Sequence, residues 1–183
     1  MPVTHITGNA LDFPENTNVL AHGCNTLGSF GAGVALQIAQ EYPAAAEADK
    51  AAFDARENQL GTFSSAVVAG GAKRIANLYI QESVGTDRRR VDYEALYSAL
   101  SNLRAVLENA GKEGRAYRVA MPWIGCGLAG GSKTVVRAMI EDIFGESPIE
   151  VFVVEYIPKT SEKPVETAAS AAPVTPADSS QIS

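Results

Sequence analysis

The chain has 183 residues, of which 46% are hydrophobic and 20% charged, and its formal net charge is -6. That length supports one domain with a full core rather than two, and the acidic balance argues against a nucleic-acid-binding surface that relies on overall positive charge. The two cysteines, Cys24 and Cys126, lack the spacing of metal ligands. The N-terminus carries no secretory signal, and no apolar run approaches the ~20 residues that span a membrane. We therefore expect a cytoplasmic chain with no membrane partner.

Short apolar runs alternate with helical patterns along most of the chain. In order, the predicted elements are strands over residues 3–6 and 19–21, helices over 34–42 and 44–58, strands over 63–69 and 74–80, a helix over 92–110, a strand over 117–122, a helix over 134–144 and a strand over 149–157. Pro43 stops the first helix, and Ser132 is the expected N-cap of the last one. Alternating strands and helices, with several fully apolar strands, predict a layered α/β fold with a mostly parallel sheet.

Two segments stand apart from this pattern. Residues 88–90 are three consecutive arginines in a polar loop, which is either solvated or meets a ligand phosphate. Residues 159–183 consist largely of alanine, proline, serine and threonine, and cannot bury enough apolar surface to offset the entropy of ordering. We therefore predict a folded domain over residues 1–158 and a disordered tail over 159–183.

Two glycine-rich loops are the strongest candidates for a binding site. The first, residues 28–33, follows a strand and precedes a helix, and the second, residues 124–131, does the same. Such loops present main-chain N–H groups and the positive end of a helix dipole to an anion. The spacing is neither the dinucleotide fingerprint nor a Walker loop, so each loop alone is equally consistent with a tight connection. Side by side at the carboxyl ends of parallel strands, the two loops would cradle a diphosphate.

Three stretches together resemble the macro domain family, which binds ADP-ribose. They are Thr-Gly-Asn at residues 7–9, HGCNTLGSFGAGVAL from His22, and MPWIGCGLAGG from Met121. The resemblance is greatest to the branch that contains ADP-ribose-1''-phosphate phosphatases and terminal ADP-ribose glycohydrolases. It implies a three-layer α/β/α sandwich with a mixed, mostly parallel central sheet. It also implies an adenine end near Gly8 and Asn9, a pyrophosphate between the loops, and a terminal ribose near Asn25.

Three positions depart from the family pattern. Asn9 stands where the family usually has an aspartate that accepts from the adenine amino group, although a carboxamide oxygen still accepts. The glycohydrolase branch has an aspartate at the position of Ala129 and a lysine in the loop before the long helix, where residues 81–86 contain none. The lysine and aspartate route to cleaving an acyl-linked ADP-ribose is therefore not expected here.

His22 and Asn25 are the predicted catalytic residues. His22 matches a histidine of the phosphatase-like members, and a histidine can transfer a proton near neutral pH. The alternative is a core histidine hydrogen-bonded to a backbone carbonyl. Asn25 can bond the ribose hydroxyls, or it can stabilise the loop as an Asx turn. Cys126 is expected to be small filler rather than a nucleophile, and Trp123 is either core or pocket wall.

From these residues and the resemblance we expect a metal-independent hydrolase that removes phosphate from ADP-ribose 1''-phosphate. The alternatives are an ADP-ribosyl hydrolase acting on protein or nucleic acid, and a non-catalytic module. The expected partners are ADP-ribose or a derivative, or an ADP-ribosylated macromolecule, bound by a monomer without a cofactor. The predicted ligand-binding residues are Gly8, Asn9, Asn25, Gly28, Ser29, Phe30, Gly31, Ala32, Gly33, Val34, Pro122, Ile124, Gly125, Cys126, Gly127, Leu128 and Ala129.

Overall fold

The computed structural model describes residues 3–157, and the predicted tail over 159–183 lies outside this range. The described part contains one six-stranded sheet in the order β1-β6-β5-β2-β4-β3. The strands are β1 (Val3–Thr7), β2 (Val19–Asn25), β3 (Phe63–Val68), β4 (Lys73–Gln81), β5 (Arg118–Pro122) and β6 (Glu150–Glu155). All neighbours pair in parallel except β3, which is antiparallel to β4 at one edge. The predicted mixed, mostly parallel sheet is confirmed.

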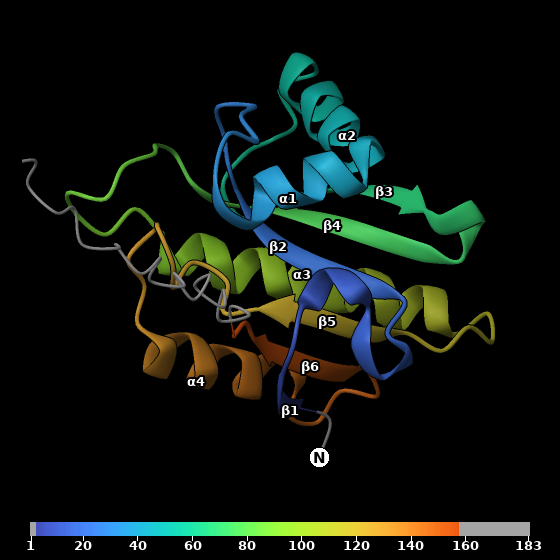
Figure 1. The fold of residues 1–183 in the computed structure, drawn as a ribbon. Helices are drawn as coiled ribbons and strands as arrows, with labels where there is room; N and C mark the ends of the chain where they lie inside the picture. Colours follow the sequence, from blue (N-terminus) through green and yellow to red (C-terminus); the bar gives the residue numbers. More distant parts are fainter. Residues whose placement is uncertain (1–2, 158–183) are drawn as a thin grey trace, which may run out of the picture.

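Four helices cover the two faces of the sheet, which gives the predicted three-layer sandwich (Figure 1). They are α1 (Gly33–Glu41), α2 (Pro43–Asp54), α3 (Tyr93–Gly111) and α4 (Lys133–Phe144). Within β2, Val19 and Ala21 pack with α3 and α4, whereas Leu20 packs with α1 and α2. Alternate side chains of a strand point to opposite faces of the sheet. A strand that is buried on both faces therefore has a continuous run of apolar residues in the sequence.

Two boundaries differ from the prediction. β2 continues to Asn25 instead of ending near Ala21, because His22 and Cys24 remain paired with β4 at Asn77 and Tyr79. Pairing with a neighbouring strand thus keeps polar residues and a glycine inside the sheet. α2 ends at Asp54 rather than near residue 58, and Arg56 just beyond it has a left-handed φ of 60°.

Short elements complete the chain. The 3-10 helices span Ala10–Asp12, Pro14–Asn16 and Ala69–Gly71. The last of these makes the predicted turn between β3 and β4. Asp92 caps α3 through its side chain, which accepts from the Ala95 N–H at 2.9 Å. None of the helices within residues 3–157 combines the length and apolar character needed to cross a bilayer.

The core on the α3 face predicts a clear contrast between two positions of the same helix. Leu103 is 1% exposed and Val106 is 53% exposed. We expect Leu103→Ala to lower the free energy of unfolding by roughly 2–5 kcal/mol, because it leaves a cavity under the helix. Val106→Ala is the matched control and should change stability by about 0.5 kcal/mol or less. Urea unfolding followed by circular dichroism measures both, and equal losses would contradict the assigned packing of α3.

Candidate functional site

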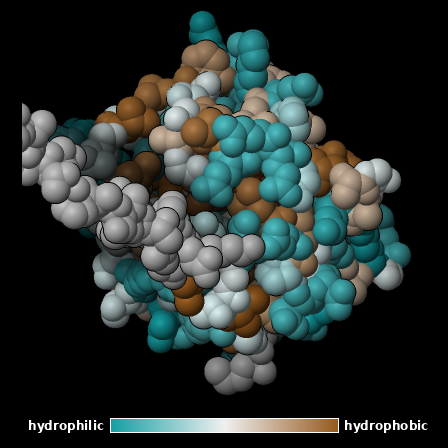
Figure 2. Space-filling model, viewed as in Figure 1, coloured by the Kyte–Doolittle hydropathy of each residue, from teal (hydrophilic) through white to brown (hydrophobic). Residues whose placement is uncertain are grey.

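A cleft of about 550 Å³ lies at the carboxyl ends of β2, β4 and β5. In Figure 2 the surface is hollowed to the left of centre, and the hollow is largely brown, so its walls are mostly hydrophobic. The lining residues are His22, Gly23, Cys24, Asn25, Ser29, Gly31, Ala32, Gly33, Val34, Ala35, Ile80, Gln81, Val84, Gly85, Thr86, Pro122, Trp123, Ile124, Gly125, Gly127, Leu128 and Ala129. Both glycine loops therefore border the same cavity, as expected for ligands at the ends of parallel strands.

The first loop joins β2 to α1 and is braced by the side chain of Asn25. Its Oδ1 accepts from the Leu27 N–H at 2.9 Å, and its Nδ2 donates to the Ser29 carbonyl at 3.0 Å. The first of these bonds is the Asx turn that the sequence left open as an alternative. Gly28, with φ 67°, packs against Phe53 so closely that an added Cβ would lie 2.8 Å from the ring. The turn therefore requires glycine at that position.

The start of α1 supplies unpaired donors to the cleft. The N-cap of α1 is Ala32, whose side chain cannot accept a hydrogen bond. The first hydrogen bond of the helix runs from the Leu36 N–H to the Ala32 carbonyl, at 3.3 Å. The N–H groups of the preceding helical residues have no acceptor within the helix. Those residues, Gly33, Val34 and Ala35, all line the cleft. An anion placed there meets both the free N–H groups and the positive end of the helix dipole.

The second loop, between β5 and α4, faces the first across the cleft. A Cβ added to Gly33 would lie 3.5 Å from Leu128 Cδ1, so the two loops approach one another closely. The Gly131 N–H donates to the Gly125 carbonyl at 2.7 Å, which holds the loop in a tight curl. Within residues 3–157, the N–H groups of Gly127, Leu128 and Ala129 form no hydrogen bond. The cleft is thus bordered by main-chain donors on two sides.

A third segment, which the sequence reading did not assign to the site, closes the remaining side. It includes Val84, Gly85 and Thr86, from the loop between β4 and α3. The Arg90 N–H donates to the Ala129 carbonyl at 2.8 Å, which ties this loop to the second glycine loop. Two signals pointed to this loop: its position at the end of a predicted parallel strand, and the lysine that the glycohydrolase branch carries where this chain has residues 81–86.

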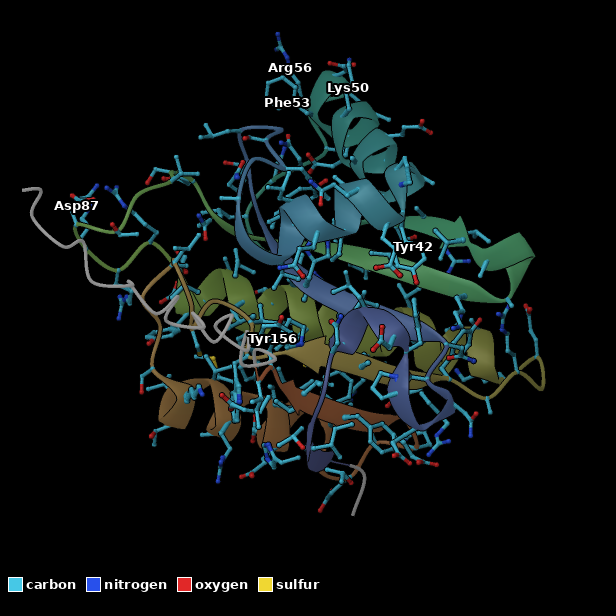
Figure 3. All side chains as sticks on the ribbon, viewed as in Figure 1. Tyr42, Lys50, Phe53, Arg56, Asp87 and Tyr156 are labelled. Atoms are coloured by element: carbon cyan, nitrogen blue, oxygen red, sulfur yellow. The ribbon has the colours of Figure 1, made fainter. Side chains whose placement is uncertain are left out.

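None of the three consecutive arginines lines the cleft. Arg90 pairs with Asp87 and also donates to Ser83 Oγ at 3.0 Å, so it braces its own loop. Asp87 lies at the far tip of that loop in Figure 3. The Arg89 guanidinium lies 4.5 Å from the centre of the Tyr93 ring. The arginines therefore lie outside the lining of the cleft, and the contact with a ligand phosphate that the sequence left open stays a prediction.

His22 lies in the floor of the cleft, but its side chain is turned inward and the residue is 0% exposed. Asn77 Nδ2 donates to the Ala45 carbonyl at 2.9 Å and to Ser64 Oγ at 3.0 Å, so Asn77 Oδ1 is left to accept from His22 Nε2 at 2.7 Å. The ring also packs edge-to-face on Phe30, with 5.4 Å between centroids. Burial lowers the pKa of His22 to about 4, although the Asn77 hydrogen bond partly opposes the shift.

The cleft is lined without ionised side chains. No aspartate, glutamate, lysine or arginine of residues 3–157 is among its lining residues. His22 is neutral at pH 7, and burial, followed by the charge of Asp49, raises the pKa of the Cys24 thiol. Cys126 lies just outside the lining, and burial likewise raises its pKa, in agreement with the expectation that it is no nucleophile.

Most of the predicted ligand residues are brought together in this cleft. Those that line it are Asn25, Ser29, Gly31, Ala32, Gly33, Val34, Pro122, Ile124, Gly125, Gly127, Leu128 and Ala129. Those that do not line it are Gly8, Asn9, Gly28, Phe30 and Cys126. Asn9 Oδ1 accepts from the Leu11 N–H at 3.1 Å, which caps the first 3-10 helix. Phe30 packs against His22 and the core instead of lining the cleft.

Comparisons with known proteins agree with this architecture. A family model described as "Macro domain" matches residues 21–140. An uncharacterized 17.5 kDa protein from the tk-vs intergenic region of Enterobacteria phage T4 is 29% identical over 162 residues, which are 86% of this chain and 99% of that protein.

Solved structures share the fold. A protein of unknown function from Bacteroides thetaiotaomicron is similar with a TM-score of 0.75 and 27% identity, over 85% of this chain and 98% of that chain. Thermosipho africanus DarTG, solved in complex with ADP-ribose, is similar with a TM-score of 0.64 and 19% identity, over 79% of this chain and 39% of that chain. At that identity the second likeness establishes the fold alone.

The buried histidine predicts a specific dependence of stability on pH. The pKa of His22 is about 4 in the folded chain, against 6.5 for an ordinary histidine. Between these values the unfolded chain binds more protons, so the free energy of unfolding falls as pH drops from about 6.5 toward 4. His22 alone accounts for roughly 3 kcal/mol of this loss at most.

Urea unfolding at pH 7 and pH 4.5 measures the effect. We expect His22→Gln to be less stable than the wild type at pH 7 but to lose less stability on acidification. His5→Gln removes the other histidine, which is exposed at the surface, and serves as the matched control that keeps the wild-type dependence. A His22→Gln variant with the full wild-type dependence would contradict the burial of an uncharged ring.

Proposed function

The chain belongs to the macro domain family, and from this membership and the geometry of the cleft we propose that it binds ADP-ribose. The observation that carries the proposal is the convergence of free main-chain donors from two loops on one cavity. Gly33 and Val34 contribute from one side, and Gly127 and Leu128 from the other. In the proposed complex the pyrophosphate lies between these donors.

The cleft is suited to a diphosphate because its donors are fixed before the ligand arrives. Main-chain N–H groups cost no side-chain entropy when they bind, and the dipole of α1 adds a favourable interaction with negative charge. The lining contains no carboxylate that would repel phosphate. The aliphatic side chains of Val84 and Leu128, which are 56% and 58% exposed, border the cavity and would cover apolar parts of the ligand.

Asn25 is the proposed contact for the terminal ribose. Its carboxamide carries two donor hydrogens and an oxygen with two lone pairs. Within the loop, one amide hydrogen of Asn25 is donated to the Ser29 carbonyl, and one oxygen lone pair accepts from the Leu27 N–H. One amide hydrogen and one lone pair therefore remain for the ribose hydroxyl groups. Gly8 and Asn9 are the proposed contacts for the adenine end, and Asn9 Oδ1 retains one lone pair beside its bond to Leu11. In this proposal Asn25 braces the first glycine loop and also contacts the ligand.

Gly31 offers a direct test of binding. Its φ is not in the left-handed region, and an added Cβ would meet only Ser29 Oγ, at 3.4 Å. We expect Gly31→Val to fill the cleft without straining the backbone and to weaken ADP-ribose binding by at least about tenfold in calorimetry. Gly111→Val, at the end of α3 where there is open space, is the matched control and should bind as the wild type does. Wild-type affinity in Gly31→Val would place the ligand elsewhere.

Removal of a 1''-phosphate is the finer proposal, with ADP-ribose release from macromolecules as its rival. The uncharged lining and the inward-facing, neutral His22 leave no side chain that exchanges a proton readily at pH 7. Turnover in this cleft would depend on main-chain donors that stabilise the developing negative charge, and on Asn25, which orients the ribose. We therefore expect His22 to support the floor of the site rather than to transfer a proton.

Phosphate release from ADP-ribose 1''-phosphate, measured under single-turnover conditions, separates these possibilities. We expect Asn25→Ala to slow release by about tenfold or more and His22→Gln to keep it within about threefold, once equal folding is shown by circular dichroism. Abolished release in a folded His22→Gln would restore the predicted catalytic histidine. Release of ADP-ribose from modified protein or DNA would identify the rival activity, and tight binding with no release would identify a binding module.

A further inference from the structure

A second cavity, of about 530 Å³, lies beside the cleft on the face of the sheet covered by α4. It is lined by His5, Ile6, Thr7, Trp123, Arg137, Val153 and Glu155. We call it the Arg137 groove. Trp123 lines both the groove and the cleft, so one side chain separates the two cavities. A ligand that extends past Trp123 from the cleft therefore enters the groove.

Among the described residues around the groove, Arg137 is a cation without an ion-pair partner. Glu155 is paired with Lys133, whose Nζ lies 2.6 Å and 2.8 Å from the two carboxylate oxygens, and it also accepts from the Trp123 indole N–H. Within residues 3–157, Arg137 has no ion pair, and its guanidinium lies 5.6 Å from the centre of the Trp123 ring. His5 stacks on the same indole with 5.3 Å between centroids. The groove thus offers a positive, hydrogen-bonding site to an anion in a chain that is acidic overall.

The groove also adjoins the turn at which the family resemblance places adenine. Thr7 lines the groove, and the next residue, Gly8, donates its N–H to the Glu155 carbonyl at 3.0 Å. The predicted adenine contacts, Gly8 and Asn9, are therefore attached to the wall of the groove rather than to the cleft. An ADP-ribose with its pyrophosphate in the cleft and its adenine at this turn would have its adenosine ribose beside Trp123.

We propose that the Arg137 groove binds a phosphate group attached to the adenosine ribose of the bound ligand. The preferred ligand is then ADP-ribose that carries a further phosphate on the 2'-hydroxyl of that ribose. Arg137 donates charge-assisted hydrogen bonds to this phosphate, and Trp123 separates it from the pyrophosphate. This inference rests on the proposed binding of ADP-ribose in the cleft.

The test compares ADP-ribose with ADP-ribose 2'-phosphate. A dimer in which the 2'-hydroxyl of one ADP-ribose forms a glycosidic bond to the next unit is the control ligand, because it is extended at the same hydroxyl but carries no phosphate there. Calorimetry gives the affinities, and the fluorescence of Trp123, the single tryptophan of the chain, reports binding at either cavity. We expect the wild type to bind ADP-ribose 2'-phosphate about five- to tenfold more tightly than ADP-ribose.

Arg137→Gln should abolish the gain while leaving the affinity for unmodified ADP-ribose unchanged. Arg56→Gln is the matched control, because it removes the same charge at the end of α2, on the opposite side of the molecule from α4 (Figure 3). The proposal is overturned if ADP-ribose 2'-phosphate binds no more tightly than ADP-ribose, if the dimer shows the same gain in affinity, or if the gain persists in Arg137→Gln. Failure of ADP-ribose itself to bind would instead overturn the proposed function of the cleft, on which the groove depends.

Discussion

The free main-chain N–H groups at the carboxyl edge of the sheet are the constraint on which the rest of the site depends. β2 and β5 are parallel neighbours, so the loops that follow them emerge side by side. The helix that follows β2 begins with an alanine, whose side chain cannot cap its first N–H groups. Within residues 3–157, the loop that follows β5 keeps a run of unpaired N–H groups. Unpaired donors at one place in the fold favour an anion there, whatever side chains surround it.

The side chains of the cleft complement this main-chain site by staying neutral. A diphosphate can then be held without an arginine, and positive charge is placed outside, in the groove beyond Trp123. The floor of the cleft is kept rigid by the bonds from His22 to Asn77 and from Asn77 to Ser64, which join three strands through buried polar contacts. Such satisfied networks are costly to disturb, because each member left without its partner would remain buried and unpaired.

The sequence predicted the order of the elements and both glycine loops, and the family resemblance predicted most of the residues that line the cleft. Residues 84–86 were not among the predicted ligand residues, because a polar loop gives no local sign of its neighbours and the family lysine of this loop is missing here. One hydrogen bond, from the Arg90 N–H to the Ala129 carbonyl, ties the loop to the second glycine loop across 39 positions of the chain. Nor did the sequence indicate that β2 continues past Ala21, since that continuation is set by pairing with β4.

What the sequence alone determined is whatever follows from local pattern: hydrophobic periodicity for strands and helices, and glycine spacing for turns that other residues cannot adopt. Only the tertiary structure decided what each polar side chain does. His22 is enclosed because Asn77 and Phe30 pack against it from other parts of the fold, and Arg137 faces Trp123 because α4 lies beside β1. The exposure and protonation of a side chain depend on neighbours that are distant in the chain. The same is true of Trp123, which forms a wall of both cavities. A local sequence pattern does not predict such neighbours.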